Sequence, residues 1–166
     1  MFVEMKVSGL TIDPLTNTPI VILKDLDGKR AVPIWIGLFE ASAIATELEK
    51  ISFSRPMTHD LLREMVKILD GKVIKIEIID LKNNTFFALI HLMKDGKVVT
   101  IDSRPSDAIA LALRVNAPIY IAEQVIEKSR SIDFVKKGEE LDKLKKEELK
   151  DFLENLSDED FGKYKM

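Results

Sequence analysis

Cysteine is absent from the 166 residues of this chain. Its absence excludes a disulfide framework, a thiolate metal site and a cysteine nucleophile. Histidine is almost as scarce, because only His59 and His91 occur. Any catalytic proton transfer by an imidazole would therefore use one of these two side chains.

Long apolar runs are also missing. Runs such as residues 109–113 are far shorter than the roughly 20 residues that a membrane-spanning helix needs. The first residues, 1–6, lack the charged and then apolar pattern of a secretion signal. We therefore expect a cytoplasmic protein.

Positive charge is not in excess, since the formal net charge is −3. A wide basic face for duplex nucleic acid is accordingly disfavoured, although a local basic patch is not excluded. The sequence also lacks the glycine-rich dinucleotide fingerprint, a Walker loop, the Gly-x-Ser-x-Gly elbow and the His-Glu-x-x-His zinc motif.

The sequence has the composition of one folded domain, with 46% apolar and 32% charged residues. Strand patterns cover residues 2–10, 19–24, 30–36, 73–79, 85–93, 98–101 and 118–122. Asp27-Gly28, Asn83-Asn84 and Asp95-Gly96 have the chemistry of tight hairpin turns. These patterns predict an α/β (α+β-like) fold with a largely antiparallel mixed sheet.

Three core helices are predicted between the strands. Apolar residues recur at three- and four-residue spacing over residues 38–51 and 61–69, and Thr58 has the chemistry of an N-cap. A third helix, 105–115, is apolar on almost every side and is expected to be buried. Residues 136–166 are rich in charge and predict a solvated helix and tail, so we divide the chain into a domain at 1–130 and an appendage at 131–166.

Two segments resemble each other, namely Ser54-Arg55-Pro56 and Ser103-Arg104-Pro105, and each is expected to lead into a helix. Proline suits the first helical position, and Thr58 and Ser106 could satisfy free backbone donors there. Capping is the simpler interpretation. The alternative is a pair of anion sites, in which Arg55 and Arg104 bind phosphate groups beside the positive helix ends.

His59, followed by Asp60, is the better candidate for a general base, because His91 lies inside a predicted strand where a cross-strand role is expected. Carboxylates suitable for Mg²⁺ or Mn²⁺ occur at several positions near these segments: Glu40, Asp60, Asp102 and Asp107. Their spacing matches no metal motif. Asp107 and Arg114, seven residues apart, could instead form a buried ion pair.

Several runs resemble the bifunctional nuclease domain family over roughly residues 1–127: Pro33-Ile34-Trp35-Ile36-Gly37, Arg55-Pro56-Met57-Thr58-His59-Asp60-Leu61-Leu62, Asp102-Ser103-Arg104-Pro105-Ser106-Asp107-Ala108-Ile109-Ala110 and Ala117-Pro118-Ile119-Tyr120. The resemblance implies DNase and RNase activity, nucleic acid as substrate and a core that self-associates. The polar positions that match the pattern of the family include Glu40, Arg55, Thr58, His59 and Asp60 in the first half. Those of the second half are Asp102, Arg104, Ser106 and Asp107.

The mechanism expected from the residues and the resemblance is metal-assisted hydrolysis of phosphodiester bonds. Asp60, Asp102 and Asp107, with Glu40, would hold one Mg²⁺ or Mn²⁺, while His59 would move a proton. The arginines, with Thr58 and Ser106, would bind phosphate. The alternatives are a non-catalytic module that binds an anion or a nucleotide, and an oligomeric structural domain. A homodimer or a higher homo-oligomer is expected in each case.

Overall fold

The computed structural model describes residues 1–130, which form one seven-stranded sheet and four helices. The strands are β1 (Phe2–Ile12), β2 (Pro19–Asp25), β3 (Ala31–Trp35), β4 (Lys72–Lys82), β5 (Thr85–Lys94), β6 (Lys97–Ser103) and β7 (Ile119–Ala122). The helices are α1 (Leu38–Leu48), α2 (Thr58–Ile68), α3 (Pro105–Val115) and α4 (Glu123–Arg130). The predicted helix within residues 136–166 lies outside the described residues.

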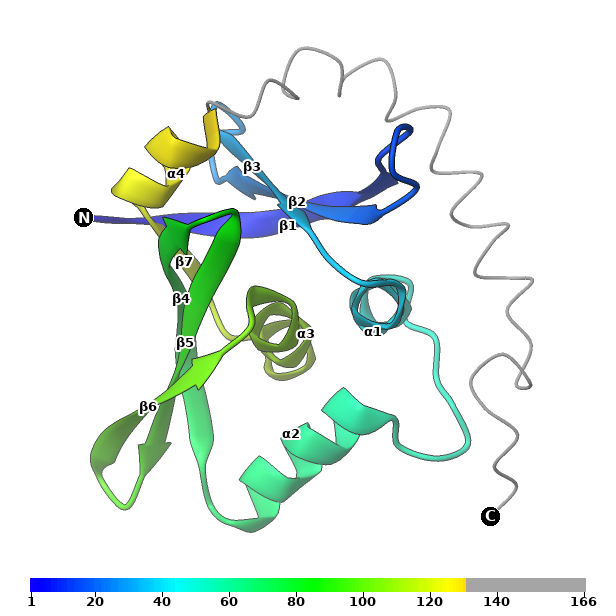
Figure 1. Cartoon of the computed structure of the whole chain (residues 1–166). Helices are drawn as coiled ribbons and strands as arrows, with labels where there is room; N and C mark the ends of the chain where they lie inside the picture. The colour runs from blue at the N-terminus through cyan, green and yellow to red at the C-terminus, as the bar shows by residue number, and fades with distance from the viewer. Residues whose placement is uncertain (131–166) are drawn as a thin grey trace.

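The sheet has the strand order β3-β2-β1-β7-β4-β5-β6. Every neighbouring pair is antiparallel except β4 and β7, which run parallel. The predicted α/β class with a largely antiparallel mixed sheet is therefore confirmed. In Figure 1 the sheet is strongly twisted, so β1, β2 and β3 cross the direction of β4 and β5.

Helix α3 lies in the middle of the molecule, between α1 and the strands β4 and β5 (Figure 1). Most of its residues are buried, as its apolar sequence predicts. Ile109 is fully buried and Leu111 is almost so, and both pack with Ile76 and Ile78 of β4 in the main core. This helix holds the segment Ser103-Arg104-Pro105, which leads into it, in a fixed position against the sheet.

Two of the three predicted hairpin turns are confirmed by backbone geometry. Asn83 and Asn84 have φ values of 48° and 59°, and Asp95 and Gly96 have 50° and 72°. The prediction of a two-residue turn at Asp27-Gly28 is wrong, because only Gly28 has a positive φ. A longer loop forms there instead.

The two Ser-Arg-Pro segments enter their helices differently. Pro105 is the first residue of α3, as predicted. Pro56 lies two residues before α2, so its predicted helical position is wrong. Helix α2 begins at Thr58, and Met57 rather than Thr58 is its N-cap. The Asp60 carboxylate accepts a hydrogen bond from the Met57 backbone N–H at 3.1 Å, which satisfies one of the free donors at this helix end.

Helix α4 was not predicted, because its eight residues are too few to show a clear helical period. Val125 and Ile126 are nonetheless buried and belong to the main core. No helix within residues 1–130 is long and apolar enough to cross a membrane. The predicted cytoplasmic location is not tested by this fold and stays a prediction.

Candidate functional site

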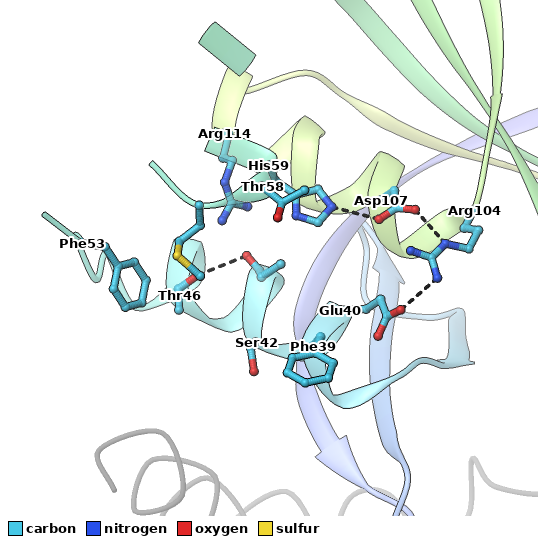
Figure 2. Close-up of a pocket in the computed structure, with 12 residues that line it drawn as sticks. Phe39, Glu40, Ser42, Thr46, Phe53, Thr58, His59, Arg104, Asp107 and Arg114 are labelled. Carbon is cyan, nitrogen blue, oxygen red and sulfur yellow. Dashed lines mark hydrogen bonds and ion pairs between the residues drawn. The ribbon is translucent and has the colours of Figure 1, made fainter. Parts of the chain in front are cut away.

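A pocket of about 370 Å³ opens between α1, the segment before α2 and the first turns of α2 and α3 (Figure 2). Twelve residues line it: Phe39, Glu40, Ser42, Ala43, Thr46, Phe53, Met57, Thr58, His59, Arg104, Asp107 and Arg114. Its size falls within the range of roughly 300–1,000 Å³ that is usual for small-molecule sites. Five of the predicted site residues are therefore brought to one pocket: Glu40, Thr58, His59, Arg104 and Asp107.

Four of these side chains form one continuous chain of hydrogen bonds (Figure 2). His59 Nε2 lies 2.9 Å from Asp107 Oδ1. The Arg104 Nε donates to the other oxygen of Asp107 at 2.7 Å, and Arg104 Nη1 donates to Glu40 Oε1 at 2.9 Å. The chain therefore orients an imidazole and a guanidinium at the same end of the pocket.

The contact between Arg104 and Asp107 follows from their positions at the start of α3. Arg104 occupies the N-cap position and Asp107 lies in the first turn, three residues later. Residues three apart on a helix are neighbours, and a carboxylate is stabilised near the positive end of the helix dipole. Arg104 remains 64% exposed in spite of its two carboxylate partners, so it is accessible to a ligand.

Gly37 makes room for the carboxylate of Glu40. A Cβ atom at Gly37 would meet Glu40 Oε2 at 2.1 Å, which is far inside van der Waals contact. Gly37 is the N-cap residue of α1, and Glu40 lies in the first turn of that helix. The glycine therefore allows the Glu40 side chain to fold over the helix end while its other oxygen, Oε1, holds Arg104.

The charges at the site determine the protonation of Asp107. Burial would raise the pKa of this carboxyl, but the hydrogen bonds and charges of Arg104 and His59 outweigh burial and hold the pKa below its ordinary value. The same contact with Asp107 raises the pKa of the Arg104 guanidinium. Asp107 is therefore ionised at neutral pH and can orient His59.

Asp60 forms an ion pair with an arginine of α3. Its Oδ1 accepts a hydrogen bond of 2.7 Å from Nε of Arg114, whose side chain is only 3% exposed. Burial would raise the pKa of Asp60, but Arg114 and the Met57 N–H outweigh it and lower the pKa. The predicted pair of Asp107 with Arg114 is thus wrong, since Arg114 joins α3 to Asp60 of α2.

Four predicted site residues do not line the pocket: Arg55, Asp60, Asp102 and Ser106. Arg55 is exposed on the segment before α2, and Ser106 is buried in the first turn of α3. Asp102 is exposed on β6 opposite Leu89 of β5. Because Ala88, the neighbour of Leu89, is fully buried in the core, Leu89 and Asp102 lie on the opposite face of the sheet.

These placements bear on the predicted divalent ion. Within residues 1–130 no group of three His, Asp or Glu side chains is arranged to hold a metal ion. The structure separates Asp60, Asp102 and Asp107, and both pocket carboxylates already accept hydrogen bonds from Arg104. The residues described here therefore do not fit the three-carboxylate metal site.

Sequence reasoning missed the remaining lining residues, among them Phe39, Phe53 and Met57. Phe39 directly precedes Glu40 at the start of α1, and that adjacency was the one available signal. Phe53 directly precedes the Ser-Arg-Pro segment without any motif of its own, whereas Met57 lies within the run that resembles the family. His91 is confirmed in its predicted cross-strand role, because its Nε2 lies 2.7 Å from Glu77 Oε2 on the neighbouring strand.

Comparison with known proteins identifies the family of this chain. A bifunctional nuclease domain model matches residues 21–133. An uncharacterized protein of Mycobacterium tuberculosis is 36% identical over 162 residues, which cover 95% of this chain and 97% of that protein. Bifunctional nuclease 1 of Arabidopsis thaliana is 28% identical over 62% of this chain and 33% of its own length, and bifunctional nuclease 2 of Oryza sativa subsp. japonica is 26% identical over 68% and 36%. The chain belongs to the bifunctional nuclease domain family.

Proposed function

We propose that this protein hydrolyses phosphodiester bonds of DNA or RNA at the pocket between α1, α2 and α3. The observation that carries the proposal is the hydrogen-bonded chain from His59 through Asp107 and Arg104 to Glu40. It places a base and a cation side by side in a chain whose family and plant relatives are named for nuclease activity.

His59 is the proposed general base. Asp107 holds Nε2 of the imidazole, so the other ring nitrogen, Nδ1, is assigned the proton of the attacking water. An ionised carboxylate behind the ring also stabilises the imidazolium that forms during the reaction. A positioned base of this kind contributes typically 10²- to 10⁴-fold to a rate.

Arg104 is the proposed phosphate ligand. Its guanidinium is planar and always charged, so it can bind two oxygens of a phosphate at once. Glu40 and Asp107 hold it in place, which reduces the conformational freedom lost when substrate binds. The same guanidinium would stabilise the negative charge that develops on the phosphate oxygens in the transition state.

A requirement for Mg²⁺ or Mn²⁺ stays a prediction. A bound divalent ion would supply charge neutralisation and an activated water, and Mg²⁺ is often held by only one or two carboxylates together with substrate phosphates. Glu40 and Asp107 are the pocket carboxylates that could contribute to such a site. Because the described residues do not form a three-ligand cluster, we derive no step through the ion.

The test is cleavage of end-labelled single- and double-stranded DNA and RNA by purified protein, with Mg²⁺, with Mn²⁺ and with EDTA. We expect His59→Gln and Asp107→Asn each to lower the rate by at least about 100-fold. His91→Gln is the matched control, because His91 is also paired with a carboxylate but lies on the strand β5, away from the pocket. Equal cleavage by wild type and both pocket variants would refute the assignment and indicate a contaminating nuclease.

A second candidate function is binding of an anion or nucleotide without turnover. It is favoured because residues 1–130 hold no cluster of three His, Asp or Glu side chains that could bind a catalytic metal ion. Thermal stabilisation by nucleotides in the absence of any cleavage would support this module over the nuclease. The predicted homodimer or higher homo-oligomer is a separate proposal, and sedimentation of the full chain tests it.

A further inference from the structure

The pocket is lined by both charged and aromatic side chains. Figure 2 shows Glu40, Arg104, Asp107 and His59 together on one side, with Phe53 on the opposite side. Phe39 extends from the start of α1 next to Glu40 (Figure 2). Met57 adds a further apolar side chain to the lining. A ligand that fills this pocket therefore has an anionic part and a flat or apolar part.

Phe39 is unusually exposed for a phenylalanine in a pocket, with 73% of its surface accessible. Its ring contributes little to the core, because the buried side of α1 consists of Ala41, Ile44, Ala45 and their neighbours. Exposed aromatic rings beside an anion site are a recurrent means of binding unpaired bases by stacking. The position of Phe39 thus indicates a role in binding rather than in folding.

The charges decide between a duplex and a single strand as ligand. Duplex binding depends on many phosphate contacts, each made by a lysine or an arginine. This pocket offers Arg104, shared by two carboxylates, and Arg114, which is buried and paired with Asp60. Contacts between the nucleic-acid phosphates and so few cations give weak affinity. Stacking of one base on an aromatic ring, by contrast, strengthens binding roughly 5- to 150-fold.

A base within a duplex is paired and stacked between its neighbours, so its face is not available to a side chain. The pocket volume of about 370 Å³ suits one nucleotide. We propose that the pocket binds one unpaired nucleotide, with its phosphate at Arg104 and its base stacked on Phe39. The protein therefore selects single-stranded nucleic acid over duplex. This inference rests on the proposed function, since it specifies the substrate class of the same site.

The test is binding of fluorescent single-stranded oligonucleotides and of the matched blunt duplex in EDTA, followed by anisotropy. We expect wild type to bind the single strand at least about 10-fold more tightly than the duplex. Phe39→Ala should weaken single-strand binding at least about 5-fold and leave duplex binding unchanged, while Phe39→Tyr should retain most of the affinity. Phe87→Ala is the matched control, because Phe87 is also exposed but lies on β5 outside the pocket.

Equal affinity for single strand and duplex, no binding of either, or equal effects of Phe39→Ala and Phe87→Ala would overturn the proposal. So would loss of an oligomer in Phe39→Ala with unchanged single-strand affinity, because the ring would then serve contact between subunits. Binding that depends on Phe39 in a protein without cleavage refutes the nuclease and leaves this inference standing. Cleavage of single strand and duplex at equal rates, unchanged in Phe39→Ala, would support the nuclease and refute this inference.

Discussion

Removing the charge of Asp60 should destabilise the fold rather than abolish the chemistry. The Asp60 side chain joins α2 to α3 through Arg114, and Arg114 is nearly inaccessible to water at 3% exposure. Helix α2 has no buried residue of its own, so this ion pair is one of its main attachments to the core. Asp60→Asn keeps the shape of the side chain and leaves the guanidinium without a charged partner.

The cost follows from the environment of the two groups. Breaking a buried ion pair by removing one partner costs about 3–5 kcal/mol, because the other charge is left uncompensated. Asp60 is 23% exposed, so water reaches the pair from one side and the lower end of that range applies. We expect a loss of about 3 kcal/mol in the free energy of unfolding, which corresponds to about 10 °C in Tm for a domain of this size.

Urea unfolding of four proteins measures this coupling: wild type, Asp60→Asn, Arg114→Met and the double variant. Arg114→Met removes the buried charge while it keeps much of the apolar volume. The double variant should be more stable than the sum of the two single losses predicts, by at least about 1.5 kcal/mol. Cleavage by Asp60→Asn, measured well below its Tm, should stay within about 3-fold of wild type, because that residue does not line the pocket.

Two results would refute this reasoning. Losses in the single variants that add to the loss in the double variant, within about 0.5 kcal/mol, would show that the two residues are not coupled. A loss of cleavage by about 100-fold in Asp60→Asn at unchanged stability would return Asp60 to the catalytic role that the sequence suggested.

Two further predictions concern the stability of the domain. Ile109→Ala should lower the free energy of unfolding by about 3 kcal/mol, because the side chain is fully buried in α3 and its removal leaves a cavity; a loss below about 1 kcal/mol in urea unfolding would contradict the packing described. The pKa values of Asp13, Asp25 and Asp60 are lower in the folded chain than their ordinary value of 3.8, so the stability that these carboxylates contribute is present above that pH and is lost as the pH falls through the lower folded values. Urea midpoints should therefore change little between pH 7 and pH 5 and fall at pH 3, and a midpoint that rises at pH 3 would contradict this sign.

The fold was largely predictable because its signals are local. The Asn83-Asn84 and Asp95-Gly96 turns are each specified by two adjacent residues that adopt positive φ. The burial of α3 follows from a helix with almost no polar side. Helix α4 was missed because its eight residues are held by contacts with β3 and β4, and sequence periodicity does not report such contacts.

The site was predictable only where its contacts are local. Arg104 and Asp107 are three residues apart at the start of one helix, so their ion pair is encoded within one turn. His59 lies 48 positions before Asp107 and reaches it because α2 packs on α3. The sequence indicated His59 as a candidate but gave no sign of its partner.

The three carboxylates that the sequence treated alike differ because of the elements that carry them. Asp107 points into the pocket from the first turn of α3, and Asp60 lies close enough to α3 to meet Arg114. Asp102 sits on β6, where side chains alternate between the two faces of the sheet. Its partner position is Leu89, beside the buried Ala88, so Asp102 faces away from the helices. A shift of one residue in the pairing of β5 with β6 would turn Asp102 toward the helices. The register of this pairing is set by the whole β5–β6 hairpin, so the Asp-Ser-Arg-Pro motif alone does not reveal which face Asp102 occupies.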